Sequence, residues 1–121
     1  MKRLTQFISP QKSRQLSDLA DRAKVSLSRY AGTDVEYNAI GLQLLDEWVE
    51  RHLKQVGEPS TEIRILWGAF LGETFRRRYQ GQWGTDRTGP SERLGIIYSR
   101  DDQAPAFIDV MGQIALRIRD G

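Results

Sequence analysis

The stretch TEIRILWGAFLGETFRRRY, residues 61–79, decides the fold. Its apolar side chains cover most of the circumference of a helix, and such a helix is normally buried on several sides. Gly68 and Gly72 interrupt it, and each costs about 1 kcal/mol relative to alanine inside a helix. The two glycines therefore predict that another backbone lies close on that side. We expect a central helix over residues 61–80, capped by Ser60.

Two amphipathic helices are expected before this central helix, because apolar residues recur there at steps of three and four. The first begins at Ser9-Pro10, where serine can accept a hydrogen bond from the first turn and proline loses no backbone bond. The second opens with Thr33 and Glu36, whose spacing is that of a capping box. Gly57 stops the second helix.

The residues after the central helix are of types that favour β-strands. Residues 82–85 and 94–98 are short β-prone runs, and residues 86–91 between them are typical of a turn. We predict an antiparallel hairpin, which must pack on helices or gain a third strand because two strands alone are marginally stable. An apolar stripe predicts a last helix that begins near Pro105.

Together these segments predict an α+β fold with three N-terminal helices, a β-hairpin or small antiparallel sheet, and a C-terminal helix. The length of 121 residues is the commonest size for one domain, so residues 1–121 are expected to form a single domain. No apolar run approaches the roughly 20 residues that a membrane helix needs. The chain has no cysteine, which fits a reducing compartment, and we expect a cytoplasmic protein without a membrane partner.

The run LWGAFLGETFRRR at residues 66–78, followed by GQW at residues 81–83, resembles a group of small uncharacterised bacterial domains. Their helix reads approximately LGAxLGExxRRxxGGxW and leads into a short sheet and a closing helix. Residues 105–121 are also similar to their PFxxVxxRL ending. The resemblance covers residues 60–121, and Gln80 stands where the pattern often has glycine. It implies the same fold in a bacterial protein, but no activity, because those domains have unknown function.

The sequence contains no recognisable catalytic or metal-binding pattern. Its one histidine, His52, lies at the edge of the apolar stripe of the second helix. A general base needs an oriented partner, and nothing in the pattern suggests one. The lack of cysteine removes both a thiol nucleophile and thiolate metal sites. We therefore expect no enzyme, no cofactor, and no catalytic, cofactor-binding or metal residues.

The most conspicuous charged feature is Arg76-Arg77-Arg78. Three successive helical residues spread over about 200°, so they do not readily face one flat partner. Arginines also suit the last turn of a helix, and Glu73 can pair with Arg77 four residues later. The alternative interpretation is that this cluster contacts an anion or a partner.

For that alternative, Trp83 and Tyr98 on the hairpin would stack on nucleic-acid bases beside the arginines. The net charge of +2 and the absence of a known nucleic-acid motif weigh against it. The candidate anion or partner contacts are Arg76, Arg77, Arg78, Trp83, Arg87 and Tyr98.

The function that the sequence favours is a non-catalytic protein-interaction or accessory module, with an unknown protein partner or self-association. The alternative is a nucleic-acid or anion-binding domain that uses the arginine cluster and the hairpin aromatics. A further alternative is a small-molecule-binding domain, with its pocket where the central helix meets the hairpin.

Overall fold

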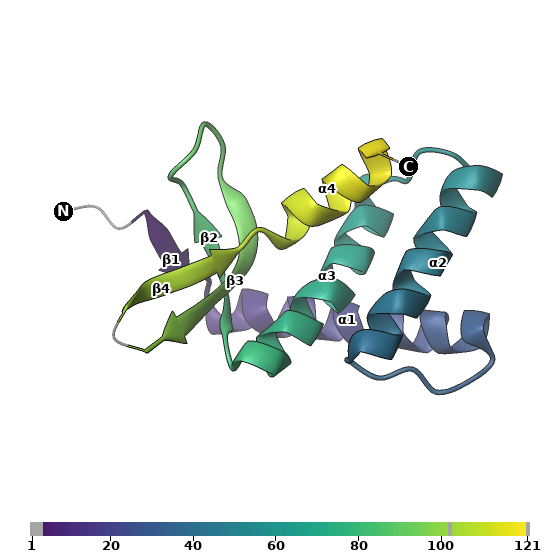
Figure 1. Cartoon of the computed structure of the whole chain (residues 1–121), viewed down its shortest axis with the longest axis horizontal. Helices are drawn as coiled ribbons and strands as arrows, with labels where there is room; N and C mark the ends of the chain where they lie inside the picture. The colour runs from purple at the N-terminus through teal and green to yellow at the C-terminus, as the bar shows by residue number, and fades with distance from the viewer. Residues whose placement is uncertain (1–3, 102, 121) are drawn as a thin grey trace.

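The structure of the chain is a computed structural model that describes residues 4–101 and 103–120. Its elements, in chain order, are β1 (Thr5–Phe7), α1 (Pro10–Ala31), α2 (Ala39–Gln55), α3 (Thr61–Tyr79), β2 (Gln82–Asp86), β3 (Arg93–Arg100), β4 (Gln103–Ile108) and α4 (Val110–Asp120). Figure 1 shows α1 running horizontally behind the lower parts of α2 and α3, and the sheet at the end opposite α2. The predicted α+β fold, with three helices, a sheet and a C-terminal helix, is confirmed.

The four strands form one antiparallel sheet in the order β1-β2-β3-β4. The predicted hairpin is β2 and β3, and it gains one strand on each side. This agrees with the expectation that a two-stranded ribbon needs further support. The sequence does not predict β1, because a strand of three residues is too short to show a period of two.

The expected start of the last helix near Pro105 is wrong. Pro105 lies within β4, where Phe107 pairs with Ile97 of β3, and α4 begins only at Val110. Phe107 fits the apolar spacing of a helix as well as that of a strand, and pairing with β3 decides between them. Asp109 caps α4, because its side chain accepts a backbone hydrogen bond from the first turn at 2.9 Å.

The expected capping box at the start of the second helix is also wrong. Residues 32–38 form an irregular loop, and Asn38 caps α2 by accepting a backbone hydrogen bond at 2.8 Å. Glu36 instead forms an ion pair with Lys24 of α1, with 3.2 Å between Oε2 and Nζ. By contrast, the caps at Ser9 of α1 and Ser60 of α3 are confirmed.

The core lies around α3, as its all-round apolar surface predicts. One cluster joins α3 to α1, α2 and α4, and a smaller one joins the sheet to α4. The buried members of the first cluster are Ala23, Leu27, Val35, Leu45, Val49, Trp67, Phe70 and Ile114. Those of the second are Trp83, Ile96 and Val110.

The prediction that a neighbouring backbone approaches Gly68 and Gly72 is wrong in its detail. Side chains occupy both places: Met111 of α4 lies against Gly68, and the indole ring of Trp83 lies against Gly72. The glycines therefore make room for a flexible thioether and a rigid aromatic ring.

Gly72→Ala is expected to lower the free energy of unfolding by about 1–3 kcal/mol, because the new methyl group would overlap the buried Trp83 ring. This range is the net loss that remains after the roughly 1 kcal/mol that alanine gains from helix propensity. Gly68→Ala is the matched control and should cost less, since Met111 can change rotamer. Urea unfolding of the two variants measures the difference, and equal stabilities would contradict this packing.

Candidate functional site

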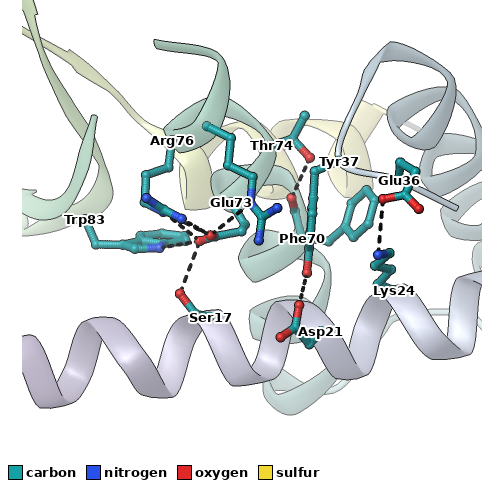
Figure 2. A network of polar contacts seen from close by, with 11 residues as sticks. Ser17, Asp21, Lys24, Glu36, Tyr37, Phe70, Glu73, Thr74, Arg76 and Trp83 are labelled. Carbon is teal, nitrogen blue, oxygen red and sulfur yellow. Dashed lines mark hydrogen bonds and ion pairs between the residues drawn. The ribbon is translucent and has the colours of Figure 1, made fainter. Parts of the chain in front are cut away.

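A buried carboxylate marks the junction of α1, α3 and the sheet. Glu73 of α3 is 1% exposed, and Ser17, Arg76 and Trp83 converge on it (Figure 2). Arg76 Nε donates to both carboxylate oxygens at 3.0 Å, and its Nη2 donates to Oε1. Trp83 Nε1 donates to Oε2 at 3.3 Å, and the Ser17 hydroxyl donates to it at 3.4 Å.

Neighbouring side chains stabilise the ionised form of this carboxylate. Burial alone would raise the pKa of the Glu73 carboxyl, but the hydrogen bonds and charge of Arg76, with bonds from Trp83 and Arg77, lower it. The hydrogen bond to Glu73 in turn raises the pKa of Arg76. The carboxylate therefore stays ionised at neutral pH. A general acid or base works best with a pKa near the operating pH, whereas this carboxyl is shifted away from it.

A second buried carboxylate fastens the β2–β3 turn. Asp86 is 3% exposed and pairs with Arg93, which stands opposite it in the β2–β3 register. Burial would raise the pKa of Asp86, but hydrogen bonds from Thr88 and Arg93 lower it. Arg93 also reaches Asp109, the cap of α4, at 3.5 Å. This cluster holds the turn, the sheet and α4 together.

His52 lies in the apolar interface between α2 and α3. Its ring meets Trp67 edge to face, with the ring centroids 5.2 Å apart. Its Nε2 is buried and has no hydrogen-bond partner among the described residues. The structure therefore gives His52 the packing position that its place in the apolar stripe indicates.

Three of the six predicted contact residues lie together at Glu73. Arg77 is four residues beyond it, and the predicted ion pair is confirmed with Nε at 3.4 Å from Oε1. Arg77 also lies over the ring of Tyr37, 4.3 Å from its centroid. Arg76 donates to the same carboxylate through Nε and Nη2. Trp83 is 1% exposed, so its ring does not present a face on which a nucleic-acid base could stack, as the alternative interpretation requires.

The other three predicted residues lie elsewhere. Tyr98 of β3 stacks on Tyr79, with 4.9 Å between ring centroids, and Arg78 lies over the same Tyr79 ring at 6.0 Å. Arg87 belongs to the β2–β3 turn and pairs with Glu92 at 2.8 Å. The arginines therefore make separate local contacts within the fold.

A cleft of about 520 Å³ lies beside the Glu73 network, where β1 leads into α1. Arg14 and Ser17 of α1 line it together with Arg76, Trp83 and Phe7. A larger hollow of about 1060 Å³ lies between α1 and the 32–38 loop, but side chains of both charges line that one. The sequence does not single out Arg14 or Phe7, since neither belongs to a motif.

β1 is an end strand of the sheet, and no other strand among the described residues pairs with its outer backbone edge. The Ile8 N–H donates to β2 at 3.3 Å, and the Leu4 carbonyl accepts from the residue after β2 at 2.8 Å. Hydrogen-bonded and non-bonded positions alternate along an antiparallel strand. Thr5 and Phe7 therefore direct their N–H and C=O groups away from β2, toward the free edge.

The two end strands of the sheet, β1 and β4, differ in how readily a further strand could pair with them. Leu4 and Phe7 at β1 are 51% and 63% exposed, which leaves apolar side chains beside the open edge. At the other end, β4 carries Pro105, which has no N–H to donate, and its pairing with β3 is irregular. Proline and irregular pairing both hinder the addition of a further strand. β1 is therefore the edge better suited to strand addition.

Comparisons with protein-family models, with curated proteins and with solved structures found no match. None of the helices in the described part of the chain is long and apolar enough to cross a membrane. Within residues 4–101 and 103–120, no group of three or more histidine, aspartate or glutamate side chains could hold a metal ion.

Proposed function

We propose that this chain is a non-catalytic protein-interaction module that binds an extended segment of a partner along β1. The observation that carries this proposal is the open edge of β1, with outward backbone groups at Thr5 and Phe7. A strand added to a sheet edge gains main-chain hydrogen bonds, and its side chains give specificity. The exposed side chains of Leu4 and Phe7 supply the apolar contact that so short a strand needs.

The use of the buried charges supports a non-catalytic role. Glu73 and Asp86 each accept several hydrogen bonds, and both have lowered pKa values. Glu73 links α3 to α1 and β2, and Asp86 links β2 to β3, so both carboxylates have structural roles. With no cysteine in the chain, we place this module in the cytoplasm of a bacterium, as its resemblance to the small bacterial domains implies.

The nucleic-acid alternative has less support. Arg76 and Arg77 share the negative charge of Glu73, and the Trp83 ring is covered. A protein that binds the phosphate backbone must offer cations free to displace counterions. A peptide paired along β1 gains main-chain hydrogen bonds that do not depend on these arginines.

Thr5→Pro is expected to abolish peptide binding while leaving the fold intact. Proline removes the outward N–H of residue 5 and no hydrogen bond to β2, a position where edge strands tolerate proline. The probe is a phage-displayed library of random peptides, selected on the natural chain. Affinities of the selected peptides for the natural chain, Thr5→Pro and the matched control Thr5→Val are then measured by fluorescence anisotropy.

Two results would contradict the proposed function. One is a selection that yields no peptide, or peptides that bind Thr5→Pro as well as Thr5→Val. The other is submicromolar binding of an oligonucleotide at about 150 mM salt that collapses when Arg76, Arg77 and Arg78 become glutamine. The second result would establish the nucleic-acid alternative.

A further inference from the structure

We propose that the segment bound at β1 is acidic, and that its carboxylates enter the adjoining cleft between Arg14 and Arg76. This inference rests on the proposed function, since it names the chemistry of the segment that pairs with β1. Phe7 connects the two places, because it belongs to the open edge and also lines the cleft. A strand added to that edge therefore runs past the mouth of the cleft.

The cleft carries positive charge. Arg14 and Arg76 are the charged residues among the described residues that line it, and no acidic side chain does so. Arg14 is exposed and forms no ion pair within the described residues. Beside the cleft, Arg76 and Arg77 both pair with the single carboxylate of Glu73. These three side chains together therefore carry a net positive charge.

Arg76 is a preordered donor. Its Nε and Nη2 are held by Glu73, whereas its Nη1 donates no hydrogen bond to the residues that the structure describes. The guanidinium is therefore fixed by a buried partner before any ligand arrives. A carboxylate that meets a fixed arginine loses less conformational entropy and forms a charge-assisted hydrogen bond.

The sequence around β1 argues against a second copy of this chain as the occupant. Residues 2–14 contain four basic residues, namely Lys2, Arg3, Lys12 and Arg14, and no acidic residue. Two copies paired through β1 would bring these like-charged segments together, and like charges across a strand pair are destabilising. An acidic partner segment gains from the same charges.

The test uses the peptides selected on the natural chain, and first compares their aspartate and glutamate content with that of the unselected library. Each peptide is then made again with asparagine and glutamine in place of its acidic residues. We expect enrichment of acidic residues, and about tenfold weaker binding of the amide versions. Anisotropy is measured on the natural chain, Arg14→Gln, Arg14→Lys and Arg22→Gln.

Arg14→Gln should weaken the acidic peptides about tenfold and leave their amide versions unchanged. Arg14→Lys should keep most of the affinity because it keeps the charge. Arg22→Gln is the matched control, because it removes an exposed arginine of α1 that does not line this cleft. Its peptide affinity should equal that of the natural chain.

The possible failures are distinguishable. Selected peptides that need the Thr5 N–H but show no acidic enrichment, or no response to Arg14→Gln, would overturn this inference and leave the proposed function standing. A selection that yields no peptide would overturn both this inference and the proposed function.

Two further results would identify a different occupant of β1. Dimers seen by sedimentation and lost in Thr5→Pro would make a second copy the occupant, and an oligonucleotide whose binding depends on Arg14 would make nucleic acid the ligand. Either of these results would also overturn the inference.

Discussion

Trp83→Ala is expected to lower the free energy of unfolding by about 3–5 kcal/mol. The indole is 1% exposed, lies against Gly72, and clusters with Ile96 and Val110. Its removal leaves a cavity at the junction of the sheet and α3, and it takes one hydrogen-bond donor from the buried Glu73 carboxylate. Urea unfolding followed by circular dichroism measures the loss.

The variant Trp83→Phe separates the contribution of ring packing from that of the hydrogen bond to Glu73. Phenylalanine keeps part of the ring contact but has no N–H to donate to Glu73. This variant should therefore lose less free energy of unfolding than Trp83→Ala and still lack the hydrogen bond to Glu73. A stable Trp83→Ala variant that loses only oligonucleotide binding would contradict the core assignment. It would show that the ring acts as a stacking platform, which usually contributes about 1–3 kcal/mol per base.

The elements that the sequence predicts correctly are fixed by local hydrogen bonds. Ser9 and Ser60 each accept a backbone hydrogen bond from a residue three positions later, so the start of α1 and of α3 can be read from neighbouring residues. β4 is different, because Phe107 fits the spacing of a helix and of a strand. Its partner Ile97 on β3 settles the choice, and that pairing is not visible in local periodicity.

The candidate site is less predictable than the fold. The pairing of Glu73 with Arg77 follows from their spacing on one helix, but the burial of Glu73 does not. Ser17, which is 56 residues away, and Trp83, ten residues away, close over its carboxylate. A glutamate in a helix is normally exposed, so the sequence gives no signal of an anchor. The open edge of β1 likewise depends on pairing with β2, a strand far along the chain.

Glu73→Gln is expected to lower the free energy of unfolding by about 2–4 kcal/mol. Removing one member of a buried ion pair typically costs about 3–5 kcal/mol, and the partial exposure of Arg76 reduces this loss. Glutamine keeps the size of the side chain, so the change reports charge and hydrogen bonding rather than a cavity. Glu47→Gln, at an exposed position on α2, is the matched control and should change stability by less than about 0.5 kcal/mol.

Acid should narrow the gap in stability between the natural chain and Glu73→Gln. The folded-state pKa of Glu73 is lowered, so its ionised form contributes stability above the unfolded-state pKa and loses it as the pH falls through the folded-state pKa. The glutamine side chain of the variant does not titrate in this pH range. The gap should therefore be constant between about pH 6 and 8 and shrink below about pH 4, near the ordinary pKa of a glutamate. Unfolding measured across this range would contradict the anchor role of Glu73 if the gap kept its full size at the lowest pH, because the carboxylate would then contribute nothing through its charge.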